Sequence, residues 1–161
     1  MSKIKELLKD DESVLVFDVD GVLAIMEWGE HNHYEVDDEE WTRLCAMGIN
    51  SYTEEKVIPK MQDFLKTKDT SKVYVISTVG NSNEIEFKKE FVNKYYNIPK
   101  ENVFGTLKDS EKLNKLKEIK LKYPNLEDKK IIMIEDSVSI LNEIMEKTGF
   151  STAHISTFFN I

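Results

Sequence analysis

Three short apolar runs constrain the fold of this chain more than any other feature. They are SVLVFDV at residues 13–19, KVYVI at 72–76 and KIIMI at 130–134. Each run is rich in β-branched residues and largely apolar throughout, which is typical of strands buried on both faces of a sheet. Stretches of about a dozen residues or more separate the runs, long enough for crossover helices. This alternation predicts an α/β fold with a mainly parallel sheet between two layers of helices, a Rossmann-like three-layer sandwich.

The segments between the runs predict the remaining elements. We expect helices over 56–65, 83–96 and 113–121, a fourth through 140–145 that ends at Gly149, and brief strands at 102–104 and 152–155. Asp109 or Ser110 is the expected N-cap of the third helix. The sheet then contains about five strands.

Residues 26–55 interrupt this rhythm and predict a short insertion, or flap, after the first strand. Its aromatic and histidine residues are Trp28, His31, His33, Tyr34 and Trp41. We expect the two histidines to be solvated, because no Cys or third His lies at a spacing typical of zinc sites. The aromatic residues either close the insertion over the core or stack on a ligand. The acidic run 37–40 indicates a solvated face or a helix N-terminus.

Length and composition favour a single intracellular domain covering residues 1–161. The net charge of −8 opposes binding to nucleic acid or to an anionic membrane. The single Cys45 forms no intrachain disulfide, which favours the cytoplasm. No run approaches the ~18 apolar residues of a membrane span, and the charged opening MSKIKELLKD is unlike a signal peptide. We therefore expect a cytoplasmic protein without membrane or nucleic-acid partners.

Polar residues follow each of the three strong strands. They are Asp18, Asp20, Ser77, Thr78, Glu135 and Asp136. In a parallel α/β sheet, ligands bind outside the carboxyl ends of the strands, so these side chains should share one site. Four carboxylates at one edge would repel one another unless a cation lies among them, and their oxygen atoms suit a hard divalent ion. The pattern therefore predicts a Mg²⁺ site.

Taken together, these motifs resemble those of the haloacid dehalogenase-like phosphohydrolases. The resemblance rests on DVDGVL at 18–23, Ser77 after VYVI, a Lys before the next helix, and EDS at 135–137, in that order. It extends over residues 14–155. It implies Mg²⁺-dependent hydrolysis of a phosphate monoester through an aspartyl-phosphate.

The resemblance also assigns roles to individual residues. Asp18 is the expected nucleophile, and Asp20 protonates the leaving oxygen and later activates water. Ser77 and a lysine bind the phosphoryl group. The metal ligands are Asp18, the backbone carbonyl of Asp20, and Asp136, with Glu135 as a further ligand or a neighbour of one. Family members with a GDSxxD ending have an additional acid where this chain has Ile140, so Glu135 would have to replace it.

The identity of the lysine stays open between two positions. Lys108 precedes the helix, whereas Lys112 begins a K-x-x-x-L helix, and we prefer Lys112. As a solvated residue at a helix start, Lys112 should contribute little to stability. Thr78 and Asn81, close to Ser77, are further candidates for substrate contacts.

The short insertion limits the expected substrate and reaction. It is too small for a full lid domain, so we expect an open site for a small phosphate ester, such as a nucleotide or sugar phosphate, with an oligomer possible. A phosphorylated macromolecule is an alternative. A phosphotransferase or mutase would use the same motifs but would need a lid to exclude water. A non-catalytic binding module would have lost one of the acids, whereas all of them are present here. A receiver-type signalling domain has its motifs in a different order.

Overall fold

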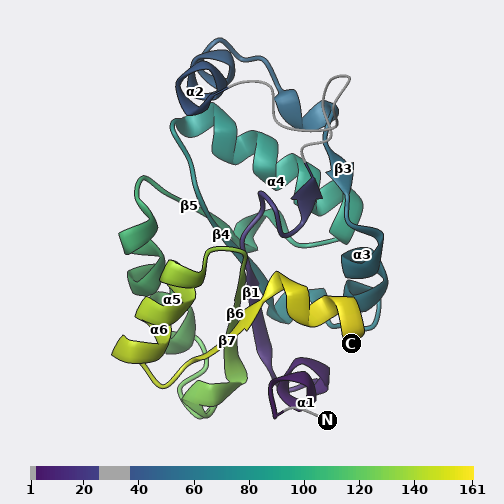
Figure 1. The fold of residues 1–161 in the computed structure, drawn as a ribbon, viewed down its shortest axis with the longest axis vertical. Coiled ribbons are helices and arrows are strands. Elements are labelled where there is room, and N and C mark those ends of the chain that lie inside the picture. The colour runs from purple at the N-terminus through teal and green to yellow at the C-terminus, as the bar shows by residue number, and fades with distance from the viewer. Residues whose placement is uncertain (1–2, 26–36) are drawn as a thin grey trace.

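A computed structural model of the chain describes residues 3–25 and 37–161. Its main sheet has five parallel strands in the order β5-β4-β1-β6-β7 (Figure 1). The strands are β1 (Val14–Phe17), β4 (Val73–Thr78), β5 (Val103–Thr106), β6 (Ile131–Glu135) and β7 (Ser151–His154). The prediction of a Rossmann-like α/β sandwich with a parallel sheet of five strands is confirmed.

Helices cover both faces of this sheet. They are α1 (Lys3–Lys9), α2 (Asp38–Ala46), α3 (Pro59–Leu65), α4 (Ser82–Tyr96), α5 (Lys112–Leu121) and α6 (Val138–Lys147). Leu15 and Phe17 of β1 pack in one apolar cluster with residues of α1, α3 and α4. Val14 and Val16 pack in a second cluster with α5 and α6, which lie together on the other side (Figure 1). Burial on both faces explains why the strand sequences do not alternate.

The segment around residues 26–55 is bounded by a small antiparallel pair, β2 (Ala24–Ile25) and β3 (Lys56–Val57). The predicted helix over 56–65 is therefore wrong at its start: two residues form β3, and α3 begins at Pro59, which is favoured at the first helical position because it needs no N–H partner. Trp28, His31, His33 and Tyr34 lie outside the described residues. The acidic run 37–40 forms the N-terminus of α2, which packs on α4 (Figure 1).

Short 3-10 turns complete the described chain, and one of them corrects a sequence expectation. They are η1 (Ser51–Thr53), η2 (Thr70–Lys72), η3 (Lys100–Asn102), η4 (Asp109–Glu111), η5 (Asp128–Lys130) and η6 (Ile155–Asn160). Neither Asp109 nor Ser110 caps α5, because both lie in η4 and the helix begins after it without a side-chain cap. Helix α6 ends at Lys147, before Gly149. Over the described residues, no helix has the length and apolar character needed to span a membrane.

Candidate functional site

Asp18, Lys112 and Glu135 meet where two neighbouring strands end. Asp18 directly follows β1, and its N–H donates to the Ile134 carbonyl of β6 at 3.0 Å. The Lys112 Nζ atom, at the start of α5, lies 3.2 Å from Asp18 Oδ2 and donates to Glu135 Oε2 at 2.7 Å. All three side chains are buried. One buried ammonium thus faces two buried carboxylates. Lys108, by contrast, is exposed.

This cluster has the composition of a site for a hard cation. Asp18, Glu135 and Asp136 each offer an oxygen atom, and these atoms lie within 4.8 Å of one another. Asp18 Oδ1 is buried and has no hydrogen-bond partner among the described residues. An unsatisfied buried oxygen costs about 1–3 kcal/mol, which a bound cation would offset. An all-oxygen set of this kind fits Mg²⁺.

The turn after β1 comes directly against this cluster, at a position that favours glycine. Gly21 has a φ of 76°, and a Cβ atom built on it would lie 2.4 Å from Asp136 Oδ2. A side chain here would be strained by its backbone conformation and would displace the Asp136 carboxylate. Glycine after the Asp18-Val19-Asp20 segment therefore lets β1 and β6 bring their acids together.

Burial dominates the electrostatics of these acids. It raises the pKa of Asp18, and the Glu135 charge adds to this, whereas Lys112 opposes it. The pKa of Glu135 is also raised, mainly by burial and then by Asp136. For Lys112, burial acts to lower the pKa, but the two carboxylates outweigh it and the net shift is upward. The site thus retains a charged lysine and would be stabilised further by a cation among its acids.

A second cluster surrounds Asp20. Tyr52 Oη donates to Asp20 Oδ1 at 2.8 Å, and Lys88 Nζ donates to Asp20 Oδ2 at 2.8 Å. Lys88, on α4, is fully buried and also donates to Ser77 Oγ and to the Thr78 carbonyl, each at 2.8 Å. The Ser77 side chain also acts to lower the pKa of Asp18. Ser77 therefore links the two clusters.

Glu84 ties this second cluster to the insertion. Its Oε1 lies 3.3 Å from Lys88 Nζ and accepts from Trp41 Nε1 at 3.1 Å, while its Oε2 accepts from the Gly80 N–H at 2.7 Å. Trp41 belongs to α2. Its expected role was either to close the insertion over the core or to stack on a ligand. The described structure shows packing, because its ring contacts Tyr52 edge-on, with centroids 5.3 Å apart.

Glu55, in the same neighbourhood, is buried, and neither of its oxygens has a hydrogen-bond partner among the described residues. Burial, and then the charge of Asp20, raise the pKa of Glu55 to about 9. Lys88, which already pairs with Asp20 and Glu84, cannot fully compensate a negative charge on Glu55. Glu55 is therefore protonated at neutral pH.

We expect Glu55→Gln to stabilise the protein increasingly as the pH rises from 5 to 8. The folded state holds a proton on Glu55 that the unfolded chain, with an ordinary glutamate pKa, has released. The free energy of unfolding of the wild type therefore falls with pH through this group, by up to about 1.4 kcal/mol per pH unit, and the amide removes this loss. Urea denaturation at several pH values measures the difference. The exposed neighbour Glu54→Gln is the control, and equal pH dependence in all three proteins would contradict the prediction.

The remaining sequence candidates have structural partners. Thr78 Oγ1 donates to Asp109 Oδ1 at 2.5 Å. The Asn81 side-chain oxygen caps α4, and its amide donates to the Thr42 carbonyl at 3.1 Å, which joins the insertion to the helix. Their roles as substrate contacts stay predictions.

Sequence reasoning missed Lys88, Tyr52 and Glu55. A signal for Lys88 was present, because Glu84, Lys88 and Phe91 recur at helical spacing on the face that also carries apolar residues. A Glu–Lys pair four residues apart on such a face indicates a buried ion pair. Tyr52 and Glu55 lie in the aperiodic insertion, where no pattern predicts which residues turn inward.

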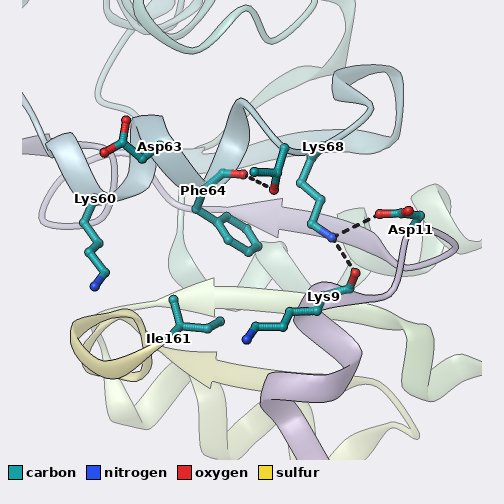
Figure 2. Close-up of a pocket in the computed structure, with 8 residues that line it drawn as sticks. Lys9, Asp11, Lys60, Asp63, Phe64, Lys68 and Ile161 are labelled. Carbon is teal, nitrogen blue, oxygen red and sulfur yellow. Dashed lines mark hydrogen bonds and ion pairs between the residues drawn. The ribbon is translucent and has the colours of Figure 1, made fainter.

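Two cavities differ in their relation to this site. One of about 550 Å³ adjoins it and is lined by Asp20, Asp38, Trp41, Thr42, Thr78, Val79, Gly80, Glu84, Leu107 and Asp109. Another of about 590 Å³, shown in Figure 2, lies between the end of α1, helix α3 and the C-terminal residue, with Lys68 reaching across to Asp11. None of the candidate site residues lines this second cavity.

Comparisons with known proteins support the fold and go no further. No protein-family model matches the sequence, and no curated protein does. Among solved structures, DsGPDH of Dunaliella salina matches with a TM-score of 0.55 and 19% sequence identity over 96% of this chain. The chain spans 25% of the length of that structure. At this identity, the likeness shows an α/β fold alone.

Proposed function

We propose that this protein is a Mg²⁺-dependent phosphatase of the haloacid dehalogenase-like type that hydrolyses a phosphate monoester through an aspartyl-phosphate. The observation that carries the proposal is the contact of Lys112 with both Asp18 and Glu135. The three residues come from three of the four motifs on which the resemblance rests. A buried lysine beside a carboxylate with one unpaired oxygen suits the attack of that carboxylate on a negatively charged phosphoryl group.

In this mechanism, an Asp18 oxygen attacks phosphorus while the bond to the ester oxygen breaks. Asp20 gives its proton to that leaving oxygen. Water then attacks the aspartyl-phosphate and returns a proton to Asp20, which releases phosphate and restores Asp18. Lys112 and the Ser77 hydroxyl contact the phosphoryl oxygens throughout. Mg²⁺, held by Asp18, Asp136 and the Asp20 carbonyl, with Glu135 as a further ligand or in contact with one, would neutralise charge on the phosphoryl group.

The 550 Å³ cavity would take the leaving group, because Asp20 and Thr78 belong both to its wall and to the site. Trp41, Val79 and Leu107 give it apolar surface, and no lysine or arginine is among the described residues that line it. Asp38 and Asp109 add exposed carboxylates at its wall. Like charges across a binding surface suppress wrong partners. We therefore expect a neutral or cationic leaving group rather than one with a second phosphate or a carboxylate.

A set of phosphate esters that differ in the charge of the leaving group tests both the proposed activity and the expected leaving group. We expect the purified protein with Mg²⁺ to release inorganic phosphate from phosphoethanolamine, glycerol 2-phosphate or a nucleoside monophosphate, and a chelator to abolish this until Mg²⁺ is restored. 3-Phosphoglycerate should be the poorest substrate, by about tenfold or more in kcat/KM. If no ester in the set is hydrolysed, the proposed activity is wrong. If the carboxylate-bearing ester is preferred, only the proposal for the leaving-group cavity fails.

A further inference from the structure

The Asp20 carboxylate is held at both oxygens by donors outside the motifs. Tyr52 Oη bonds to Oδ1 and Lys88 Nζ bonds to Oδ2, each at 2.8 Å. The Asp20 side chain is 31% exposed, so water could have satisfied it instead. Two fixed donors in place of mobile water restrict both the position and the plane of this carboxylate.

Both donors are themselves held in place, Tyr52 by ring packing and Lys88 by hydrogen bonds. The Tyr52 side chain lies between Trp41 and Phe91, with ring centroids at 5.3 Å and 5.9 Å. Lys88 donates to three acceptors, namely Asp20, Ser77 and the Thr78 carbonyl, which accounts for all the protons of its ammonium group. Neither donor can rotate away without losing buried contacts.

Asp20 needs such support because the sheet does not provide it. It lies beyond the end of β1, in the turn that contains Gly21, and its only described strand-like pairing is an isolated bridge to Ala24. A group that hands a proton to a leaving oxygen must have one oxygen within hydrogen-bond reach of it. Small misplacements of a reacting group cost large factors in rate.

We infer that Tyr52 and Lys88 are positioning residues that orient Asp20 for proton transfer, and that the insertion takes part in catalysis through Tyr52. The inference rests on the proposed function. Asp20 takes up a proton from solvent at its partly exposed side chain, delivers it to the leaving oxygen as the bond to phosphorus breaks, and regains one from the attacking water. Tyr52 and Lys88 keep their own protons and fix the direction in which that proton travels.

Tyr52→Phe separates positioning from other effects better than any change of Lys88. Lys88 also bonds to Ser77 and neutralises Glu84, so its removal would disturb phosphate binding and folding together. The phenylalanine keeps the ring contacts with Trp41 and Phe91 and removes a single hydroxyl, whose partner is partly exposed. Tyr95→Phe, a half-exposed tyrosine of α4 that also contacts Phe91, is a matched control.

The test compares two esters with the same phosphoryl group and different leaving groups, using kcat/KM because it reports the steps up to departure of the leaving group. An alkyl ester such as phosphoethanolamine needs a proton to leave, whereas p-nitrophenyl phosphate releases a stable anion. We expect Tyr52→Phe to lower kcat/KM for the alkyl ester by about tenfold or more and to leave that for the nitrophenyl ester within about twofold. Tyr95→Phe should change neither.

Further measurements decide between this role and the alternatives. In an Asp20→Asn background, Tyr52→Phe should have no additional effect, because it acts through that carboxylate. Equal losses for both esters, or no loss for either, with an unchanged melting curve would overturn the inference and leave the proposed phosphatase activity intact. Hydrolysis of neither ester by the wild type would instead refute the proposed function itself.

Discussion

Asp18→Asn is expected to abolish phosphatase turnover, by at least about 10³-fold, and to leave the protein folded. The substitution removes the nucleophile and one ligand of the proposed metal. It retains the shape of the side chain at the end of β1. The carboxyl group is buried, Oδ1 has no hydrogen-bond partner among the described residues, and burial raises its pKa. Because the ionised group is unfavourably placed in the folded protein, a neutral amide should cost little stability.

Release of inorganic phosphate, together with a melting curve, measures this prediction. Asp63→Asn, an exposed aspartate on α3 that lines the other cavity, is the control for the chemistry of the change. The control should keep wild-type activity. An Asp18→Asn protein with activity within a few-fold of the wild type would contradict the mechanism, whatever its stability.

The sheet was predictable from the sequence because its central strands are buried on both faces. The runs at 13–19, 72–76 and 130–134 became β1, β4 and β6, which lie side by side in the sheet. Once these strands are parallel and adjacent, the residues that follow them must lie close together. The strand pattern therefore predicted that Asp18, Ser77 and Glu135 lie at one edge of the sheet, and the order β4-β1-β6 makes their strands neighbours.

Other contacts of the site depend on tertiary packing that no local pattern encodes. Lys56 and Val57 have helical spacing with the residues after them, yet they pair with β2 because Pro59 sets the start of α3. Tyr52 and Glu55 reach the site because residues 37–55 pack against α4, in part through Trp41. Sequence spacing within an insertion does not determine which of its residues turn inward.

The burial of Lys112 changes what its removal should do. From the sequence it was expected to be a solvated lysine with little effect on folding, but its side chain is 2% exposed and faces two buried carboxylates. We therefore expect Lys112→Met to lower kcat/KM by about 10²-fold or more, since it removes a fixed charge facing the phosphoryl group. We also expect it to lower the free energy of unfolding by about 3–5 kcal/mol at neutral pH, because Asp18 and Glu135 lose their counter-charge.

The loss of stability in Lys112→Met should shrink as the pH falls from 8 to 5. Burial already raises the pKa of Asp18 and of Glu135, and removal of the ammonium raises both further. The folded variant therefore takes up protons at a higher pH than the unfolded chain does, and protonation relieves the repulsion. Urea denaturation across this range measures the effect, with the exposed Lys108→Met as the control. Glu135→Gln should restore part of the stability lost in Lys112→Met, because one buried charge then replaces two. A loss that is independent of pH and not relieved by Glu135→Gln would show that packing, not charge, is the contribution of Lys112.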